Sequence, residues 1–129
     1  MTTLNSDSNL EELLSEHFES PLNYGILDGF TNKVTVKNES CGDVLDLYTI
    51  FKKGKLANLS FESKSCALSL ASASIFFDKI KGKSIKELEK ISEEEVFEIL
   101  GFKPITSRTN CVLLPFRALQ KSLQTLGKK

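Results

Sequence analysis

Three cysteines, Cys41, Cys66 and Cys111, are the residues of this chain best suited to chemistry, and each stands where an element of secondary structure is expected to begin or end. Cys41 falls in an expected turn with Gly42 and Asp43 after it, whereas Cys66 and Cys111 fall at expected helix starts. Unpaired N–H groups and the helix dipole favour a thiolate at a helix start. Three thiolates and the Asp43 carboxylate form a donor set that suits tetrahedral Zn²⁺, or iron held with sulfide.

Two other interpretations of these residues stay open at this point. The three cysteines include no CxxC pair, and their odd number does not predict a disulfide framework. Cysteines are often small buried hydrophobes, and Asp43 could be a plain turn residue. The chain would then be a small interaction domain whose cysteines only fill the core.

The spacing of apolar side chains predicts the elements that would position these residues. Within residues 1–20, an N-terminal helix with one apolar stripe is expected, and Pro21 ends it; the stripe consists of Leu10, Leu13, Leu14 and Phe18. Residues 33–61 change to a period of two, which predicts three short strands (33–37, 44–51 and 56–61) in an antiparallel meander. A tight hairpin turn is expected at residues 52–55.

Residues 65–126 have a helical pattern. The run from Cys66 is rich in small residues, which predicts a helix pressed against the sheet and ending near Gly82. Ser84 and Ser92 each begin a capping box, and Pro115 predicts a last helix that starts no earlier than residue 110 or 111. Residues 1–129 are therefore expected to form a single α+β domain, a small antiparallel three-stranded sheet packed against helices.

The composition limits the classes of partner. The chain carries 17 Lys and Arg against 17 Asp and Glu, so no net charge favours nucleic acid or an anionic membrane. No apolar run approaches the roughly 20 residues of a membrane span, and the polar N-terminus does not resemble a secretory signal. We therefore expect a cytoplasmic protein whose partners include no nucleic acid and no membrane.

Several segments together resemble the U-type iron–sulfur cluster assembly scaffold family, which comprises NifU N-terminal and IscU-like domains and the zinc-binding SufU-like proteins. The similarity covers about residues 18–126 and lies in the segments PLNYG (21–25), SCGD (40–43), GKL to Phe61 (54–61), SCA to SAS (65–74) and IKGKS (80–84), and in the late Cys111. The resemblance implies an α+β sandwich whose cysteines hold a metal or cluster near one end of the sheet.

The resemblance also implies a ligand set. Scaffolds of this family usually carry histidine just before the third cysteine, and SufU-like proteins carry lysine there, but this chain has Asn110, a poor ligand. The only histidine, His17, is expected at the surface of the first helix. The implied ligands are therefore Cys41, Asp43, Cys66 and Cys111, and replacing the matching aspartate in family scaffolds is associated with a longer-lived cluster.

The activity implied by the resemblance is that of a scaffold and not of an enzyme. Such a scaffold accepts sulfur from a cysteine desulfurase, binds iron, and holds a transient [2Fe–2S] cluster for transfer to apo iron–sulfur proteins. Cys111 is the expected first sulfur acceptor, or Cys41 if the chain behaves like the SufU branch. The alternative function is a zinc-dependent SufU-like sulfurtransferase that relays persulfide, with zinc in the same site.

The sequence combines features of the scaffold branch and of the SufU-like branch. It lacks the segment that SufU-like proteins insert between the second and third cysteines, which favours a scaffold. The residues before Cys111, Ser107 to Asn110, look more like the SufU branch. The loop at 102–106 keeps a single proline of the Leu-Pro-Pro-Val-Lys loop that a dedicated Hsp70-type chaperone recognises, so recognition by such a chaperone is doubtful.

Overall fold

The structure, a computed structural model, describes residues 12, 14–38, 42–104 and 109–127. A helical segment at residues 12 and 14–19 precedes three strands and four further helices within these residues. Their bounds are β1 (Asn32–Asn38), β2 (Asp43–Lys52), β3 (Lys55–Lys64), α2 (Ala67–Ile80), α3 (Ile85–Glu89), α4 (Glu93–Leu100) and α5 (Thr109–Gly127). None of the described helices is both long and apolar enough to span a membrane.

The strands form one antiparallel sheet in the order β1-β2-β3, as the alternation of side chains predicts. The hairpin between β2 and β3 turns on Lys53 and Gly54, whose φ angles of 53° and 77° are the left-handed values that a two-residue type I′ turn requires. Alternation then sends one set of side chains to an inner face. The apolar members of that set are Val34, Val36, Leu45, Leu47, Leu59 and Phe61.

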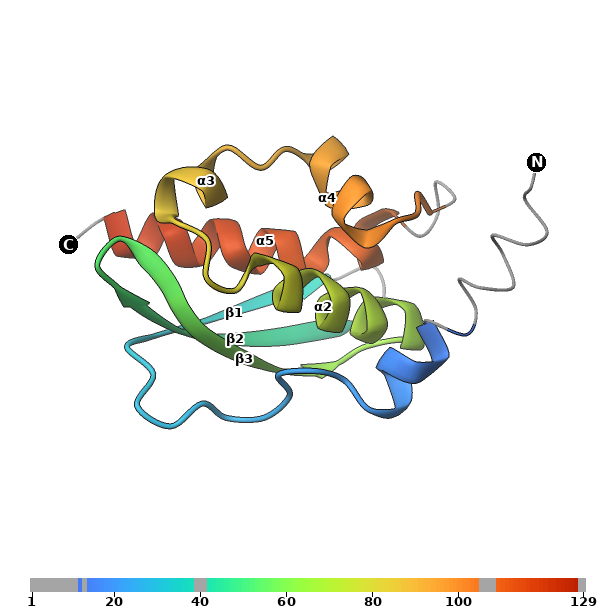
Figure 1. The fold of residues 1–129 in the computed structure, drawn as a ribbon. Coiled ribbons are helices and arrows are strands. Elements are labelled where there is room, and N and C mark those ends of the chain that lie inside the picture. Colours follow the sequence, from blue (N-terminus) through green and yellow to red (C-terminus); the bar gives the residue numbers. More distant parts are fainter. Residues whose placement is uncertain (1–11, 13, 39–41, 105–108, 128–129) are drawn as a thin grey trace.

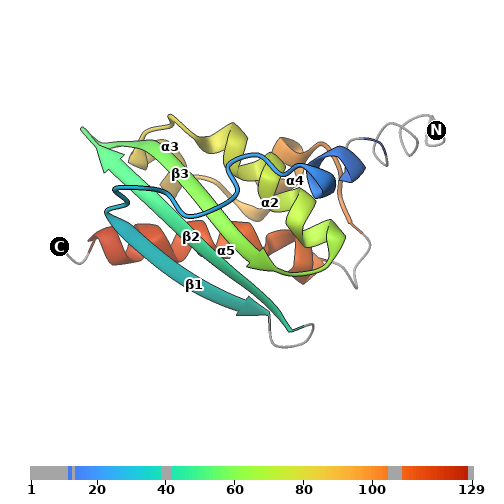
Figure 2. The ribbon, with the colours of Figure 1, turned by 90° about the horizontal axis from the view of Figure 1, so that it is seen from below.

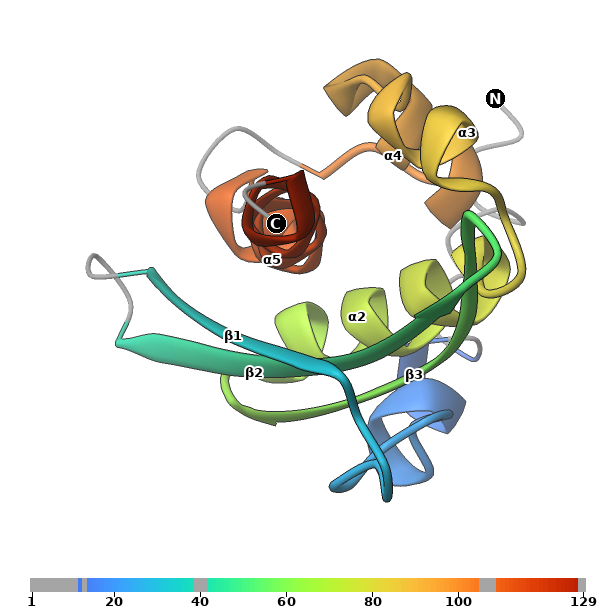
Figure 3. The ribbon, with the colours of Figure 1, turned by 90° about the vertical axis from the view of Figure 1, so that its left-hand side faces the viewer.

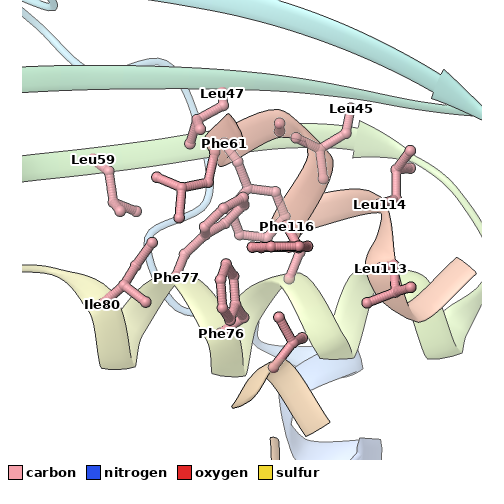
Figure 4. Packing of buried hydrophobic residues seen from close by; sticks show 14 of the residues in the cluster. Leu45, Leu47, Leu59, Phe61, Phe76, Phe77, Ile80, Leu113, Leu114 and Phe116 are labelled. Atoms are coloured by element: carbon pink, nitrogen blue, oxygen red, sulfur yellow. The ribbon is translucent and has the colours of Figure 1, made fainter. Parts of the chain in front are cut away.

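Helices α2 and α5 cover the inner face of the sheet, and α3 and α4 form a further layer above them (Figures 1 and 3). The core lies between the sheet and this helix pair (Figure 4). Four aromatic rings cross it, from Phe61 of β3 through Phe77 and Phe76 of α2 to Phe116 of α5, with centroids 5.3 to 6.3 Å apart. The predicted α+β class, with a three-stranded sheet against helices, is therefore correct.

The chain before β1 crosses the opposite, outer side of the sheet (Figure 2). It pairs with β3 at one point, where Gly25 N donates to Phe61 O (2.8 Å) and Phe61 N donates to Asn23 O (2.9 Å). Phe18, which belongs to the expected apolar stripe of the first helix, is 44% exposed. It lies beside Leu14, one helical turn earlier, at a pocket formed with Ala67 and Leu68 of α2, so the stripe faces α2 but buries Phe18 only in part.

Ser74 of α2 anchors this N-terminal segment. Its Oγ shares a hydrogen bond with His17 Nδ1 (2.6 Å) and accepts one from Leu22 N (2.8 Å). His17 is therefore half-buried, contrary to the expected surface position, because the buried hydroxyl of Ser74 offers it a partner. No sequence period could have revealed a contact that spans 57 positions.

We expect Ser74→Ala to lower the free energy of unfolding by about 1–2 kcal/mol, because it leaves Leu22 N–H and the His17 ring without their shared partner. Ser72→Ala, two positions away, is the matched control, since Ser72 Oγ is buried with no hydrogen-bond partner among the described residues. The control should be neutral or slightly stabilising, because alanine favours the helix by up to about 0.5 kcal/mol. Urea unfolding of both variants measures the difference, and equal losses would refute the anchor.

The helix boundaries partly follow local sequence chemistry. Both predicted capping boxes are present, with Ser84 and Ser92 each accepting from the backbone N–H three residues later. The expectation from Pro115 is wrong, because α5 begins at Thr109 and Pro115 lies well inside it. An interior proline costs about 3 kcal/mol, and burial of residues 111–116 along this stretch of α5 offsets that cost.

Candidate metal centre

Asp43 is the first residue of β2 and lies on the inner face of the sheet, directly across from Asn38 of β1. The pairs next to them on this face, Val36–Leu45 and Val34–Leu47, are apolar. Both Asp43 and Asn38 are nonetheless 4% exposed. The inner face therefore finishes in a buried polar pair at the end of the sheet where β1 ends and β2 begins.

Cys66 and Cys111 reach the same region from two helices. Cys66 is the half-buried N-cap of α2, and Cys111 is the third residue of α5 and 2% exposed. Both cysteines thus stand at the positive end of a helix dipole, where thiolate charge is favoured. The α2 helix begins there because Cys66 is extended (φ −68°, ψ 164°) and its carbonyl accepts from Leu70 N (3.0 Å).

The tertiary structure brings these three side chains together. One ligand atom each from Asp43, Cys66 and Cys111 lies within 4.8 Å of the other two, although the residues are 23 and 45 positions apart in sequence. A tetrahedral Zn²⁺ with bonds of about 2.3 Å to sulfur holds two sulfur atoms about 3.8 Å apart. The three ligand atoms, within 4.8 Å of one another, are thus close to the spacing that a shared metal ion requires.

The surroundings of Asp43 Oδ2 show whether this group of ligand atoms suits a cation. The atom is buried and has no hydrogen-bond partner among the described residues. A buried carboxylate oxygen left without a partner costs free energy, of the order of 1–3 kcal/mol or more for a charged group. A cation bound between Asp43 and the two thiolates would remove that cost, so the residues present fit a metal ion.

The remaining candidates of the sequence analysis fall elsewhere. Cys41 lies outside the described residues; the next residue, Gly42, donates its N–H to Asn38 O (2.8 Å) and has a φ of +74° that favours glycine. Asn110 is exposed, and its Oδ1 accepts from Arg117 Nη2 (2.8 Å). His17 does not belong to the group of ligand atoms formed by the described residues.

Sequence reasoning missed Asn38, whose Nδ2 lies 4.0 Å from Cys111 Sγ. A signal was available, since Asn38 continues the inner-face positions of Val34 and Val36 in β1 and is polar where an apolar residue is expected. Its interpretation required the position of Cys111, which the sequence does not give.

A shallow cavity of about 470 Å³ opens on the outer side of the sheet, away from the inner-face ligand group. Lysines and carboxylates both line it, namely Lys37, Lys64, Asp46 and Glu62 beside Tyr24. Nearby, burial and a hydrogen bond to Glu62 raise the pKa of Tyr48 to about 12, so Tyr48 stays protonated and donates to Glu62 Oε1 (2.9 Å) at neutral pH. Among the described residues, the lining of this cavity includes no cysteine.

Comparison with known families and proteins gives a consistent result. The family described as the NifU-like N-terminal domain matches residues 10–129. The iron–sulfur cluster assembly scaffold protein IscU 1 of Archaeoglobus fulgidus is 32% identical over 114 residues, which cover 88% of this chain and 74% of the relative. The scaffold protein IscU of Thermotoga maritima is 29% identical over 133 residues, covering 91% of this chain and 94% of that protein.

Solved structures share the fold. A putative iron–sulfur cluster assembly scaffold protein for the SUF system from Fervidobacterium islandicum aligns with a TM-score of 0.73 at 25% identity, covering 87% of this chain and 94% of the other. The N-terminal part of a nitrogen-fixing NifU-like protein from Brucella abortus aligns with a TM-score of 0.77 at 22% identity over 91% of this chain and 93% of that one. At that identity the second likeness speaks for the fold alone.

Proposed function

The chain belongs to the NifU-like N-terminal domain family, and we propose that it is a scaffold on which iron–sulfur clusters are assembled and from which they are passed on. The observation that carries this proposal is the convergence of Asp43, Cys66 and Cys111 within 4.8 Å, with a buried carboxylate oxygen that lacks a partner among the described residues. Thiolates with one carboxylate suit iron held with sulfide. The relatives named above as scaffold proteins support the same function.

In this function the cluster is cargo, and the four proposed ligands divide the work. Cys41, Cys66 and Cys111 hold iron through sulfur, and Asp43 supplies an oxygen ligand that exchanges more readily than a thiolate. One weak ligand among three strong ones keeps the cluster bound during assembly and allows its release to an apo-protein. The partial exposure of Cys66 supports access of a partner to the proposed site.

Sulfur would arrive as a persulfide on a cysteine desulfurase. The acceptor thiolate attacks the outer sulfur, a new S–S bond forms, the S–S bond of the desulfurase breaks, and its cysteine leaves as a thiolate. Cys111 is the proposed acceptor, with Cys41 as the alternative. Because Cys111 is 2% exposed, transfer to it requires the site to open when the desulfurase docks.

A zinc-dependent sulfurtransferase is the second candidate, because the same donor set also suits tetrahedral Zn²⁺. This alternative rests on the resemblance to zinc-binding SufU-like proteins; the solved SUF-system relative at 25% identity is itself named as a putative scaffold. Zinc would then occupy the ligands until the desulfurase displaces one of them, and the chain would relay persulfide to a later acceptor without building a cluster. Participation of an Hsp70-type chaperone stays doubtful, since the described part of its loop, Phe102 to Pro104, has one proline.

Anaerobic reconstitution separates these functions. The full chain is incubated with ferrous iron, cysteine, a cysteine desulfurase, and dithiothreitol as the reductant that converts persulfide to sulfide. We expect the visible absorption of a [2Fe–2S] cluster to appear on the chain and then to move to an apo-ferredoxin. The matched control omits the desulfurase and should stay colourless.

Two other outcomes would decide against the scaffold. One tightly bound zinc per chain with persulfide transfer but no chromophore would establish the sulfurtransferase. Three ordinary thiols with neither metal nor chromophore would show that the cysteines only fill the core.

A further inference from the structure

Asn38 places an amide beside the proposed metal ligands. It is the last residue of β1, 4% exposed, and faces Asp43 across the strand pair. Its Nδ2 lies 4.0 Å from Cys111 Sγ. Directly opposed residues of an antiparallel pair have Cβ atoms about 4.5–5.5 Å apart, so the amide borders both a thiol ligand and the carboxylate ligand.

The backbone of Asn38 serves a separate contact, since its carbonyl accepts from Gly42 N at 2.8 Å. Any residue at position 38 provides the same carbonyl. The side-chain amide is buried as well, and burying a polar group costs free energy unless it is hydrogen-bonded, so its approach to Cys111 Sγ is the contact that bears on the metal centre.

We propose that Asn38 is a positioning residue of the metal centre, which donates its amide N–H to the Cys111 thiolate and so fixes and stabilises that ligand when metal is bound. The proposal rests on the proposed function only in requiring a metal ion among these ligands. It concerns the affinity and electronic state of the centre, whichever metal the centre carries.

The charge of the site gives the physical reason. Among the described ligands, two thiolates and one carboxylate around a divalent ion leave a formal charge of about −1, and two of these three side chains, Asp43 and Cys111, are almost fully buried. Such a charge needs donors, and the starts of α2 and α5 supply only the partial charge of helix dipoles. An N–H donor at sulfur offsets part of the thiolate charge, and outer partners of metal ligands typically contribute 10- to 100-fold in metal affinity.

The test compares two asparagines of the same strand. Asn38→Leu removes the amide with similar volume, and Asn38→Asp keeps the shape while replacing the donor by a negative charge. Asn32→Leu is the matched control, because Asn32 lies at the other end of β1, about 20 Å away, and its Nδ2 also donates to α5, at Ser122 O (3.3 Å) and Oγ (3.1 Å). Thermal unfolding of each metal-free chain checks the fold.

Two readouts separate an electronic role from a structural one. Zn²⁺ affinity is measured by competition with a chromophoric chelator, and Co²⁺ substitution reports the thiolate-to-metal charge-transfer bands. We expect Asn38→Leu to weaken Zn²⁺ binding 10- to 100-fold. The charge-transfer bands of the Co²⁺ form should shift to lower energy, because a thiolate that accepts no hydrogen bond transfers charge to the metal more easily. Asn38→Asp should weaken Zn²⁺ binding at least as much, and Asn32→Leu should change neither readout.

Unchanged affinity and unchanged Co²⁺ bands in both Asn38 variants would overturn the proposal while leaving the metal centre intact. An equal loss in Asn32→Leu would also overturn it, because general loosening of β1 against α5 would then explain the effect. A wild-type chain that binds neither ion would instead remove the proposed centre itself, and the role of Asn38 with it.

Discussion

Cys66→Ser and Cys111→Ser are each expected to lose bound metal almost completely, and Cys41→Ser to do the same. A serine hydroxyl does not ionise at neutral pH and is a poor ligand for Zn²⁺ or iron compared with a thiolate. The loss should exceed the roughly 100-fold that outer partners of a ligand contribute, because a bond to the metal itself disappears. Metal content per chain after anaerobic purification and dialysis measures the effect.

The fold should survive in these variants. Cys66 and Cys111 stand beside a core that four aromatic rings and the inner face of the sheet already fill. We expect Cys111→Ser, at a 2% exposed position, to cost about 1–2 kcal/mol of unfolding free energy, and Cys66→Ser to cost less. Retention of full metal stoichiometry by two of the three single variants would disprove the ligand assignment.

Asp43→Ala is expected to prolong the life of the bound cluster several-fold. A carboxylate that can leave and return opens a coordination position to an incoming acceptor thiolate, and alanine offers nothing to exchange. The measurement follows the visible [2Fe–2S] absorption after addition of an apo-ferredoxin. Equal decay in wild type and Asp43→Ala would exclude Asp43 from the exchange step.

Asp46→Ala is the matched control for this experiment. Asp46 lies three positions further along β2 but on the outer face, where its Oδ1 accepts from Thr35 Oγ1 at 2.5 Å. Its loss should cost about 1 kcal/mol of stability and leave the decay unchanged.

Stability gives Asp43 a second, independent test. If Asp43 only capped the turn, Asp43→Ala would lower stability by about 1 kcal/mol. Its Oδ2 has no hydrogen-bond partner in the described part of the chain, so we expect the metal-free Asp43→Ala chain to be as stable as wild type or more stable. Urea unfolding of both metal-free proteins distinguishes the two roles.

Local chemistry made much of the fold predictable. The turn at Lys53 and Gly54, the capping boxes at Ser84 and Ser92, and the helix start at Cys66 each depend on residues within four positions of one another. The period of two in the strands then fixed which side chains face the helices. These features follow from backbone conformations and caps that a short segment can satisfy by itself.

Local rules failed where distant contacts outweighed them. Pro115 lies inside α5 because its neighbours are buried against the sheet and α2, and His17 is half-buried because its ring is hydrogen-bonded to Ser74 of α2. A proline penalty or a helix stripe describes one segment, whereas burial is decided by what another segment presents to it. Neither partner is visible in the local sequence.

For the candidate site, too, some features follow from the sequence and others only from the tertiary structure. The sequence by itself determined the donor types, their placement at the starts of elements, and the resemblance that groups Cys41, Asp43, Cys66 and Cys111 as ligands. Only the tertiary structure decided that Asp43, Cys66 and Cys111 meet within 4.8 Å and that Asn38 borders them. The reason is that β1, β2, α2 and α5 converge at one end of the sheet through packing of the core, and such packing depends on residues far apart in sequence, such as Asn38 and Cys111 at 73 positions and Asn32 and Ser122 at 90.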